Sequence, residues 1–157
     1  MPTPPFTTVF TLALLALAFA SQAVAAAATN LVIRVQSNTV SGTLTHHPPA
    51  GPRNDVVVEH DALVNAKPGQ FGQQVGAPVG TDVATITYRT NTTLVIRASA
   101  MLPGGTILVA GTVTVKPGRP TVVPVVGGSG AYAGATGTET IGTSPTAPLN
   151  VYRISLP

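Results

Sequence analysis

The sequence predicts an all-β protein, an antiparallel barrel or sandwich of seven or eight short strands, and three observations support this. The apolar residues are mainly Val, Leu, Ile and Ala, with many Thr, and branched β-carbons such as those of Val, Ile and Thr suit a pleated surface. The 16 Gly and 15 Pro among 157 residues divide the chain into short segments. No helical periodicity follows residue 28, which leaves strands joined by turns as the main elements.

The overall composition excludes several classes of site and partner. Without cysteine, the chain has no disulfide framework, no thiolate metal centre and no cysteine nucleophile. The net charge of +3 comes from eight Lys and Arg, scattered singly, against five acidic residues, and aromatic residues make up only 4% of the chain. A nucleic-acid-binding surface needs clustered basic residues, usually with aromatic residues for stacking, so we predict no nucleic-acid partner.

The N-terminal 25 residues have the pattern of a secretory signal peptide. Residues 9–20 are apolar apart from Thr11, and Ala23 and Ala25 supply small residues before a cleavage site. The segment before the apolar run lacks Lys and Arg, and an uncleaved membrane anchor is the alternative interpretation. We therefore expect residues 1–25 to be removed and residues 26–157 to form one secreted domain that has no contact with a membrane.

Alternating apolar and polar residues place the strands in order along the rest of the chain. In the first of them Leu31, Ile33 and Val35 share one face, because successive side chains of a strand point to opposite sides. The same reasoning predicts strands over residues 31–36, 55–64, 82–88, 93–100, 106–115, 121–126, 138–143 and 150–156, with a short further strand over residues 40–45.

Proline and glycine mark the connections between these strands. Residues 46–52, HHPPAGP, are predicted to form a loop because their prolines cannot lie inside a sheet. Turns are expected at residues 67–69, 89–92, 101–105 and 116–120, and residues 71–80 are Gly-rich and expected to be irregular. Gly111 lies in the middle of a predicted strand, where it suggests a bend or a bulge.

A Gly-rich segment late in the chain carries a family resemblance. It is no phosphate loop, since neither a Lys nor a helix follows GGSG at residues 127–130. Residues 123–137, VPVVGGSGAYAGATG, instead resemble a motif of dirigent proteins and allene oxide cyclases, in which a Val-rich strand precedes Gly-Gly-Ser-Gly, an aromatic residue, an Ala and a closing Gly. Three further stretches agree in order: HDALV at 60–64 with GQFG at 69–72, LPGGTILVAG at 102–111, and NVY at 150–152.

The resemblance to this family implies an eight-stranded antiparallel barrel whose lumen holds a small apolar or phenolic molecule. It also implies chemistry without a cofactor and a homo-oligomer, either a dimer or a trimer. The family's functional residues differ here, because dirigent motifs typically have an acidic residue and an Arg where this chain has Ala131 and Thr136. Allene oxide cyclases use a first-strand glutamate and a nearby cysteine, whereas the first strand here offers Arg34 and Gln36. The resemblance therefore extends to the scaffold more than to either named activity.

Glu59 and Asp61 are the main catalytic candidates, because residues two apart on a strand share a face. Paired carboxylates perform acid–base chemistry when burial raises the pKa of one of them, whereas on a solvated face they remain ordinary surface charges. His60 points the opposite way, either as a lumen base or as a surface residue. Tyr88 is the third candidate, as a hydrogen-bond donor to a phenol or a carbonyl in a pocket.

Arg34, Arg97 and Tyr132 are the candidate ligand-binding residues. Arg97 interrupts an otherwise apolar strand, so it lies either on the solvent face or in the lumen with a partner, and the same choice applies to Arg34. Tyr132 occupies the aromatic position of the family motif, where it either contacts a ligand or packs under the Gly-rich loop. The adjacent histidines of the Pro-rich loop lack a third ligand, so we predict no metal site.

Three functions remain open on the sequence, and the lumen distinguishes them. The first is a dirigent-like barrel that binds a small molecule and orients it for stereocontrolled coupling or cyclisation without a cofactor. The second is a cofactor-free cyclase or isomerase, and the third is a non-catalytic secreted structural or interaction barrel. A lumen carboxylate with a tyrosine or arginine within reach supports chemistry, an aliphatic lumen supports binding, and a filled lumen supports a structural role.

Overall fold

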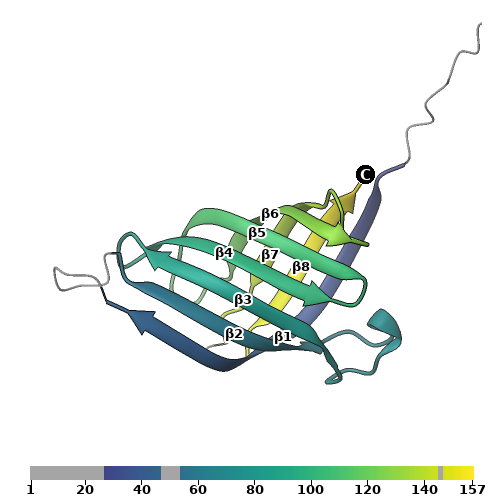
Figure 1. Ribbon diagram of the computed structural model, residues 1–157, viewed down its shortest axis with the longest axis horizontal. Coiled ribbons are helices and arrows are strands. Elements are labelled where there is room, and N and C mark those ends of the chain that lie inside the picture. Colours follow the sequence, from purple (N-terminus) through teal and green to yellow (C-terminus); the bar gives the residue numbers. More distant parts are fainter. Residues whose placement is uncertain (1–26, 47–53, 145–146) are drawn as a thin grey trace, which may run out of the picture.

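Eight antiparallel strands close into a barrel in which every strand pairs with its neighbours in the sequence (Figure 1). The computed structural model describes residues 27–46, 54–144 and 147–157. The elements are β1 (Thr29–Thr45), β2 (Val56–Asn65), the 3-10 turn η1 (Gln70–Gly72), β3 (Pro78–Tyr88), β4 (Thr93–Leu102), β5 (Gly105–Thr114), β6 (Thr121–Gly130), β7 (Thr136–Ile141) and β8 (Leu149–Leu156). Pairing of β1 with β8 closes the barrel, and the predicted all-β, eight-stranded antiparallel barrel is confirmed.

Two segments predicted from the sequence fall outside these residues. The residues that the structure describes also show whether a helix could cross a membrane. The expected signal peptide, residues 1–25, and residues 47–52 of the predicted Pro-rich loop lie outside the described residues. Within the ranges just given, no helix is long and apolar enough to cross a membrane.

The first strand differs from the prediction in its continuity. Residues 31–36 and 40–45 belong to one strand, β1, rather than to two. The pairing of β1 with β2 shifts register between Thr39 and Ser41, which is the signature of a β-bulge. The extra residue breaks the alternation of side chains without ending the strand, and this explains why the sequence pattern suggested an interruption. β3 likewise begins at Pro78, inside the Gly-rich segment that was expected to be irregular.

Glycine residues allow close packing between strands in β5 and a turn of the chain in the Gly-rich segment. Gly111 stays in regular pairing with Ile96 on β4, and the register shift in β5 lies in its pairing with β6, between Leu108 and Val109. A Cβ on Gly111 would lie only 2.8 Å from Cδ of Pro124 on β6, so this site needs a glycine for packing. Gly130 has a φ of 60°, as expected for a residue that turns the chain out of β6.

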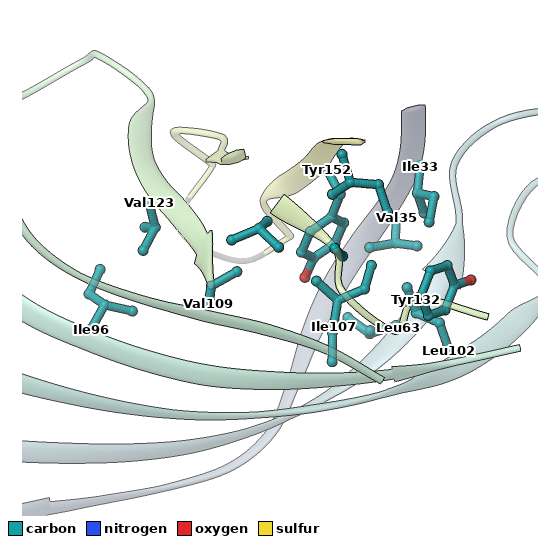
Figure 2. Close-up of a cluster of buried hydrophobic side chains, with 14 of the residues drawn as sticks. Ile33, Val35, Leu63, Ile96, Leu102, Ile107, Val109, Val123, Tyr132 and Tyr152 are labelled. Carbon is teal, nitrogen blue, oxygen red and sulfur yellow. The ribbon is translucent and has the colours of Figure 1, made fainter. Parts of the chain in front are cut away.

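One half of the barrel interior is filled with apolar side chains, and we call it the apolar half. Its residues are Ile33, Val35, Leu63, Leu102, Ile107, Tyr132 and Ile154, all 7% exposed or less. Figure 2 shows most of these side chains gathered around Tyr152. The hydroxyl of Tyr132 donates a 2.9 Å hydrogen bond to the carbonyl oxygen of Pro103, so this ring packs beneath the Gly-rich loop. Burial of each large aliphatic side chain contributes roughly 1.5–3 kcal/mol to stability.

A buried amide holds the β2–β3 connection over the same end of the barrel. Asn65 is 1% exposed, and its Nδ2 lies 2.8 Å from the carbonyl oxygen of Lys67 and 3.0 Å from that of Gln73. The side chain of Gln70 accepts a hydrogen bond from the backbone N–H of Arg34 and donates one to the carbonyl oxygen of the same residue, both 2.9 Å. The connection is therefore fastened to β1 and β2.

Candidate functional site

The other half of the lumen encloses a cavity of about 110 Å³, which we call the lumen cavity. Its lining residues are Ser37, Glu59, Asp61, Asp82, Ala84, Ile86, Ile96, Ala98, Glu139, Ile141, Pro148 and Asn150. Ala84 on β3 pairs directly with Ala98 on β4, and these two small side chains leave space where the apolar half is filled. Because an apolar cavity of about 150 Å³ holds benzene, this cavity has room for a group of roughly one ring.

Four of the five acidic residues of the chain line the lumen cavity, and we call them the acidic cluster. Glu59 and Asp61 come from β2, Asp82 from β3 and Glu139 from β7. Asp61 and Asp82 face each other as a cross-strand pair, and Asp82 and Glu139 are only 6% and 3% exposed. The fifth acid, Asp55, does not line the cavity, and its Oδ2 lies 2.8 Å from Nδ1 of His46.

The basic residues show the opposite distribution. All seven Lys and Arg among the described residues are exposed, and none lines the lumen cavity: Arg34, Lys67, Arg89, Arg97, Lys116, Arg119 and Arg153. Buried charges in proteins are normally paired, because removing an unpaired charge from water is costly. The acidic cluster therefore reduces its charge by binding protons.

Burial and mutual repulsion raise the pKa of three members of the acidic cluster. Burial and then repulsion from Asp61 raise the pKa of Asp82 to about 6, with the smallest contribution from Glu59, although backbone N–H groups of Val83 and Ser99 oppose the shift. Burial also raises the pKa of Glu139 to about 7, with a smaller contribution from the charge of Asp82. The pKa of Glu59 is raised by burial and by the neighbouring Asp61.

Tyr152 connects the acidic cluster with the apolar half. It pairs with Glu139 across β7 and β8 and with Ile33 across β1 and β8, and it is 1% exposed. Burial and the carboxylate of Glu139 raise its pKa well above the usual range, so its hydroxyl stays protonated and is the donor of the hydrogen bond that these two side chains share. That hydrogen bond lowers the pKa of Glu139 and opposes part of the effect of burial.

Three buried oxygen atoms of the cavity wall accept no hydrogen bond from another group of the protein. They are Oδ1 of Asp61, Oδ1 of Asp82 and Oδ1 of Asn150. The amide Nδ2 of Asn150 donates a 2.8 Å hydrogen bond to Oγ of Ser37, so these two neutral groups are already paired with each other. An unsatisfied buried acceptor costs about 1–3 kcal/mol, and a molecule that supplies donors removes this cost.

The residues predicted from the sequence lie in three different places. Glu59 and Asp61 line the lumen cavity together, whereas His60 between them is exposed. Tyr88 shares the inward face of β3 with Ile86 but lies further towards the strand end and is not among the lining residues. The ligand-binding candidates point elsewhere: Arg34 and Arg97 are exposed on the outer wall, and Tyr132 is buried at the opposite end of the barrel.

The sequence analysis missed Asp82, Glu139 and Tyr152 as functional candidates. Each is a single polar residue on its own strand, and no local motif joins them. Alternation was the available signal, because Asp82 shares a face with Ile86, and Glu139 shares one with Ile141. That signal shows which face of the strand a residue occupies, and only barrel closure shows that the three faces meet.

A second, larger cavity lies at the apolar end of the barrel. It has a volume of about 570 Å³ and is lined by Leu31, Val32, Ile33, Lys67, Pro68, Gly69, Gln70, Phe71, Ala131, Tyr132 and Leu156. Its one charged side chain, that of Lys67, is exposed, and the amide of Gln70 is already bonded to β1. The lumen cavity is the better candidate for chemistry despite its smaller volume. Across the described ranges, no three His, Asp or Glu side chains gather as a metal site.

Comparisons with solved structures agree with this barrel. A pyocyanin demethylase has 17% sequence identity and a TM-score of 0.64, over 78% of this chain and 99% of that one. An exo-specific intermolecular Diels-Alderase has 14% identity and a TM-score of 0.65, over 83% and 100%. A pterocarpan synthase dirigent protein has 16% identity and a TM-score of 0.57, over 82% and 83%. At these identities the likeness shows a shared fold.

Comparison of the sequence itself gives the family. No curated protein matches it. The family model described as allene oxide cyclase barrel like domain matches residues 32–156, which include nearly every strand residue of the barrel. The chain therefore belongs to the family of allene oxide cyclase barrel-like domains.

Proposed function

We propose that this protein binds a small organic molecule in the lumen cavity and catalyses proton transfer on it, in an isomerisation or a cyclisation that needs no cofactor. One observation carries the proposal: Asp82 and Glu139, with pKa values of about 6 and about 7, belong to one enclosed cavity. Near neutral pH such a pair holds a proton on one carboxyl group and a negative charge on the other. An acid and a base are then available to the same bound molecule.

The roles follow from the environment of each side chain. Asp82 has the lower pKa of the two and an unpartnered Oδ1, so it accepts a proton from the substrate. Glu139 has the higher pKa and is the proton donor, and the hydroxyl of Tyr152 fixes its orientation. One proton is removed and one is returned, so the product has the same mass as the substrate. The barrel wall supplies orientation and excludes water.

A purely orienting, dirigent-like role is the second candidate. The family and the fold shared with a pterocarpan synthase dirigent protein and an exo-specific intermolecular Diels-Alderase favour it. In that role the lumen would hold a small apolar or phenolic molecule for stereocontrolled coupling without proton transfer by the wall. The buried carboxylates favour the acid–base role, because orientation alone requires no charged groups.

Secretion and assembly belong to the same proposal. Residues 1–25 are proposed to be a signal peptide, residues 26–157 the secreted domain, and the domain a homo-oligomer, either a dimer or a trimer. N-terminal sequencing of protein from the medium of its producing cells tests cleavage, with a new N-terminus near Ala26 as the expected result. Native mass spectrometry of the same sample gives the oligomeric state and any retained small molecule.

The catalytic proposal is tested by a search for conversion without change of mass. Purified protein is incubated, without added cofactor, with small-molecule fractions of the producing cells, and the products are separated by chromatography with mass detection. We expect one compound to decrease while an isomer of equal mass appears. Glu139→Gln should slow the conversion on the order of 100-fold, whereas Arg153→Gln, on the outer face of β8, should preserve it. The proposal fails if Glu139→Gln converts the compound as fast as the wild type.

A further inference from the structure

We infer that the lumen cavity selects a compact organic cation, such as a protonated amine with a small hydrocarbon part, which binds between the carboxylates of Asp61 and Asp82. The inference rests on the proposed function and names its ligand class. It contrasts with the apolar or phenolic ligand that the family resemblance implied.

The first argument is the charge of the wall. The lining contains four acidic residues and no basic residue, while every described Lys and Arg is exposed outside the lumen. An anionic ligand would meet like charges inside an enclosed wall, where interactions between charges are weakly screened. A cationic ligand supplies the opposite charge that the acidic cluster lacks within the barrel.

The second argument is the hydrogen-bonding pattern, which is independent of charge. The three unpartnered atoms of the wall, on Asp61, Asp82 and Asn150, are all acceptors. Asp82 and Asn150 are only 6% and 5% exposed, so bulk water does not reach them freely. The neutral donor Asn150 Nδ2 is bonded to Ser37. The ligand must therefore bring several N–H or O–H donors, and an ammonium group brings three.

The third argument separates an organic cation from a metal ion. In the part of the chain that the structure describes, no three acidic or His side chains converge on a point where one ion would sit. The carboxylates are distributed over β2, β3 and β7, around a space of about 110 Å³. Between them the wall is hydrocarbon, from Ala84, Ala98 and Ile96. A molecule with N–H donors on a small apolar body fits this distribution.

Proton release is a consequence that can be measured. A bound cation favours the ionised form of Asp82, so its affinity should rise as Asp82, whose pKa is about 6, loses its proton. The titratable groups that face the cavity are Glu59 and Asp61 on β2, Asp82 on β3, Glu139 on β7 and, beside it, Tyr152 on β8. The lining residues from β1 and β4 are Ser37, Ile96 and Ala98, none of which titrates.

The test compares three ring-matched probes by calorimetry on the intact mature protein: cyclopentylamine, cyclopentanol and cyclopentanecarboxylate. At pH 7.5 we expect the ammonium form to bind at least 10-fold more tightly than the alcohol, and the carboxylate to show no saturable binding. The affinity of the amine should rise at least 10-fold from pH 5 to pH 8, with protons released, while that of the alcohol changes less than 3-fold.

Matched variants locate the effect in the acidic cluster. Asp82→Asn should weaken amine binding at least 10-fold and leave alcohol binding within 3-fold. Asp55→Asn removes a carboxylate outside the cavity, and thermal melting identifies which variants are folded. Folded Asp55→Asn should bind the amine as the wild type does. If the alcohol or the carboxylate binds as tightly as the amine, the cation class is wrong while lumen binding stands. If no probe binds, the inference is overturned, and conversion without change of mass still decides the proposed function.

Discussion

The two halves of the lumen are built from the same strands yet have opposite chemistry. β2 contributes Leu63 to the apolar half and Glu59 and Asp61 to the lumen cavity. β8 contributes Ile154 to the first and Asn150 to the second, with Tyr152 between them. In a barrel, each strand crosses both regions, so moving two residues along a strand changes the half and keeps the inward direction. Stability and chemistry can therefore be altered separately.

The difference shows how four acids are tolerated inside a small protein. The apolar half supplies burial, and the closed ladder of eight strands satisfies the backbone without a free edge in the paired segments. The acidic cluster then lowers its own cost by holding protons, as the raised pKa values of Asp82 and Glu139 indicate. The predictions below separate the two contributions.

The largest effect on stability should come from the apolar half. Leu63 is 0% exposed, and Leu63→Ala should lower the free energy of unfolding by about 3 kcal/mol, because it removes a packed side chain and leaves a cavity. Urea denaturation followed by far-UV circular dichroism measures the change. Leu149→Ala, at a side chain that is 41% exposed, is the matched control and should cost about 0.5 kcal/mol or less. Equal losses from the two variants would contradict a stability centred on the apolar half.

The largest effect on activity should come from the lumen cavity. Glu139→Gln keeps the shape and the acceptor for Tyr152 but cannot exchange a proton, so the rate of conversion should fall on the order of 100-fold. Initial rates are measured with the compound that the search for conversion without change of mass identifies as the substrate. Tyr152→Phe removes the orienting hydroxyl and should lower the rate on the order of 10-fold while moving the basic limb of the pH–rate profile, which reports the proton donor Glu139. An unmoved profile would assign Tyr152 a purely structural role.

The next largest effect should be the pH dependence of the free energy of unfolding, which we expect to arise from the lumen cavity rather than from the apolar half. The pKa of Glu139 is raised to about 7 in the folded protein, so between about 4.5 and 7 the folded state binds more protons than the unfolded chain. The free energy of unfolding should therefore fall as the pH rises through this window, by on the order of 3 kcal/mol from this residue. Denaturation midpoints at pH 4 and pH 8 measure it. In the Glu139→Gln variant the free energy of unfolding should depend less on pH, and at pH 8 the variant should be more stable than the wild type.

The smallest effects should come from the outer wall. Arg34 and Arg97 were predicted from the sequence as ligand residues, but both are exposed on the outside. Arg97→Gln and Arg34→Gln should change the free energy of unfolding by about 0.5 kcal/mol or less and leave amine binding unchanged. Calorimetry with cyclopentylamine tests this. A 10-fold loss of binding in either variant would return that arginine to the binding site.

The sequence predicted the barrel and half of the acidic cluster. Alternation placed Glu59 and Asp61 on one face, because period two is a local property of a strand. Asp82 and Glu139 were not predicted, since they meet that pair through the register of Asp61 with Asp82 and through closure around the barrel. The same alternation placed Arg34 on the face of β1 that does not carry Ile33, and the exposure of Arg34 agrees with that placement. The bulge in β1 was hidden because an extra residue and a turn both interrupt alternation.

The central claim is that the lumen holds desolvated carboxyl groups that share protons near neutral pH, and titration by nuclear magnetic resonance tests it directly. The chemical shifts of the side-chain carboxyl carbons are followed from pH 3 to pH 9 in uniformly ¹³C-labelled mature protein, with Asp82→Asn and Glu139→Gln to assign the signals. The account predicts that Glu139 titrates near pH 7 and Asp82 near pH 6. Titration of both groups at their ordinary values, 4.5 and 3.8, would contradict it.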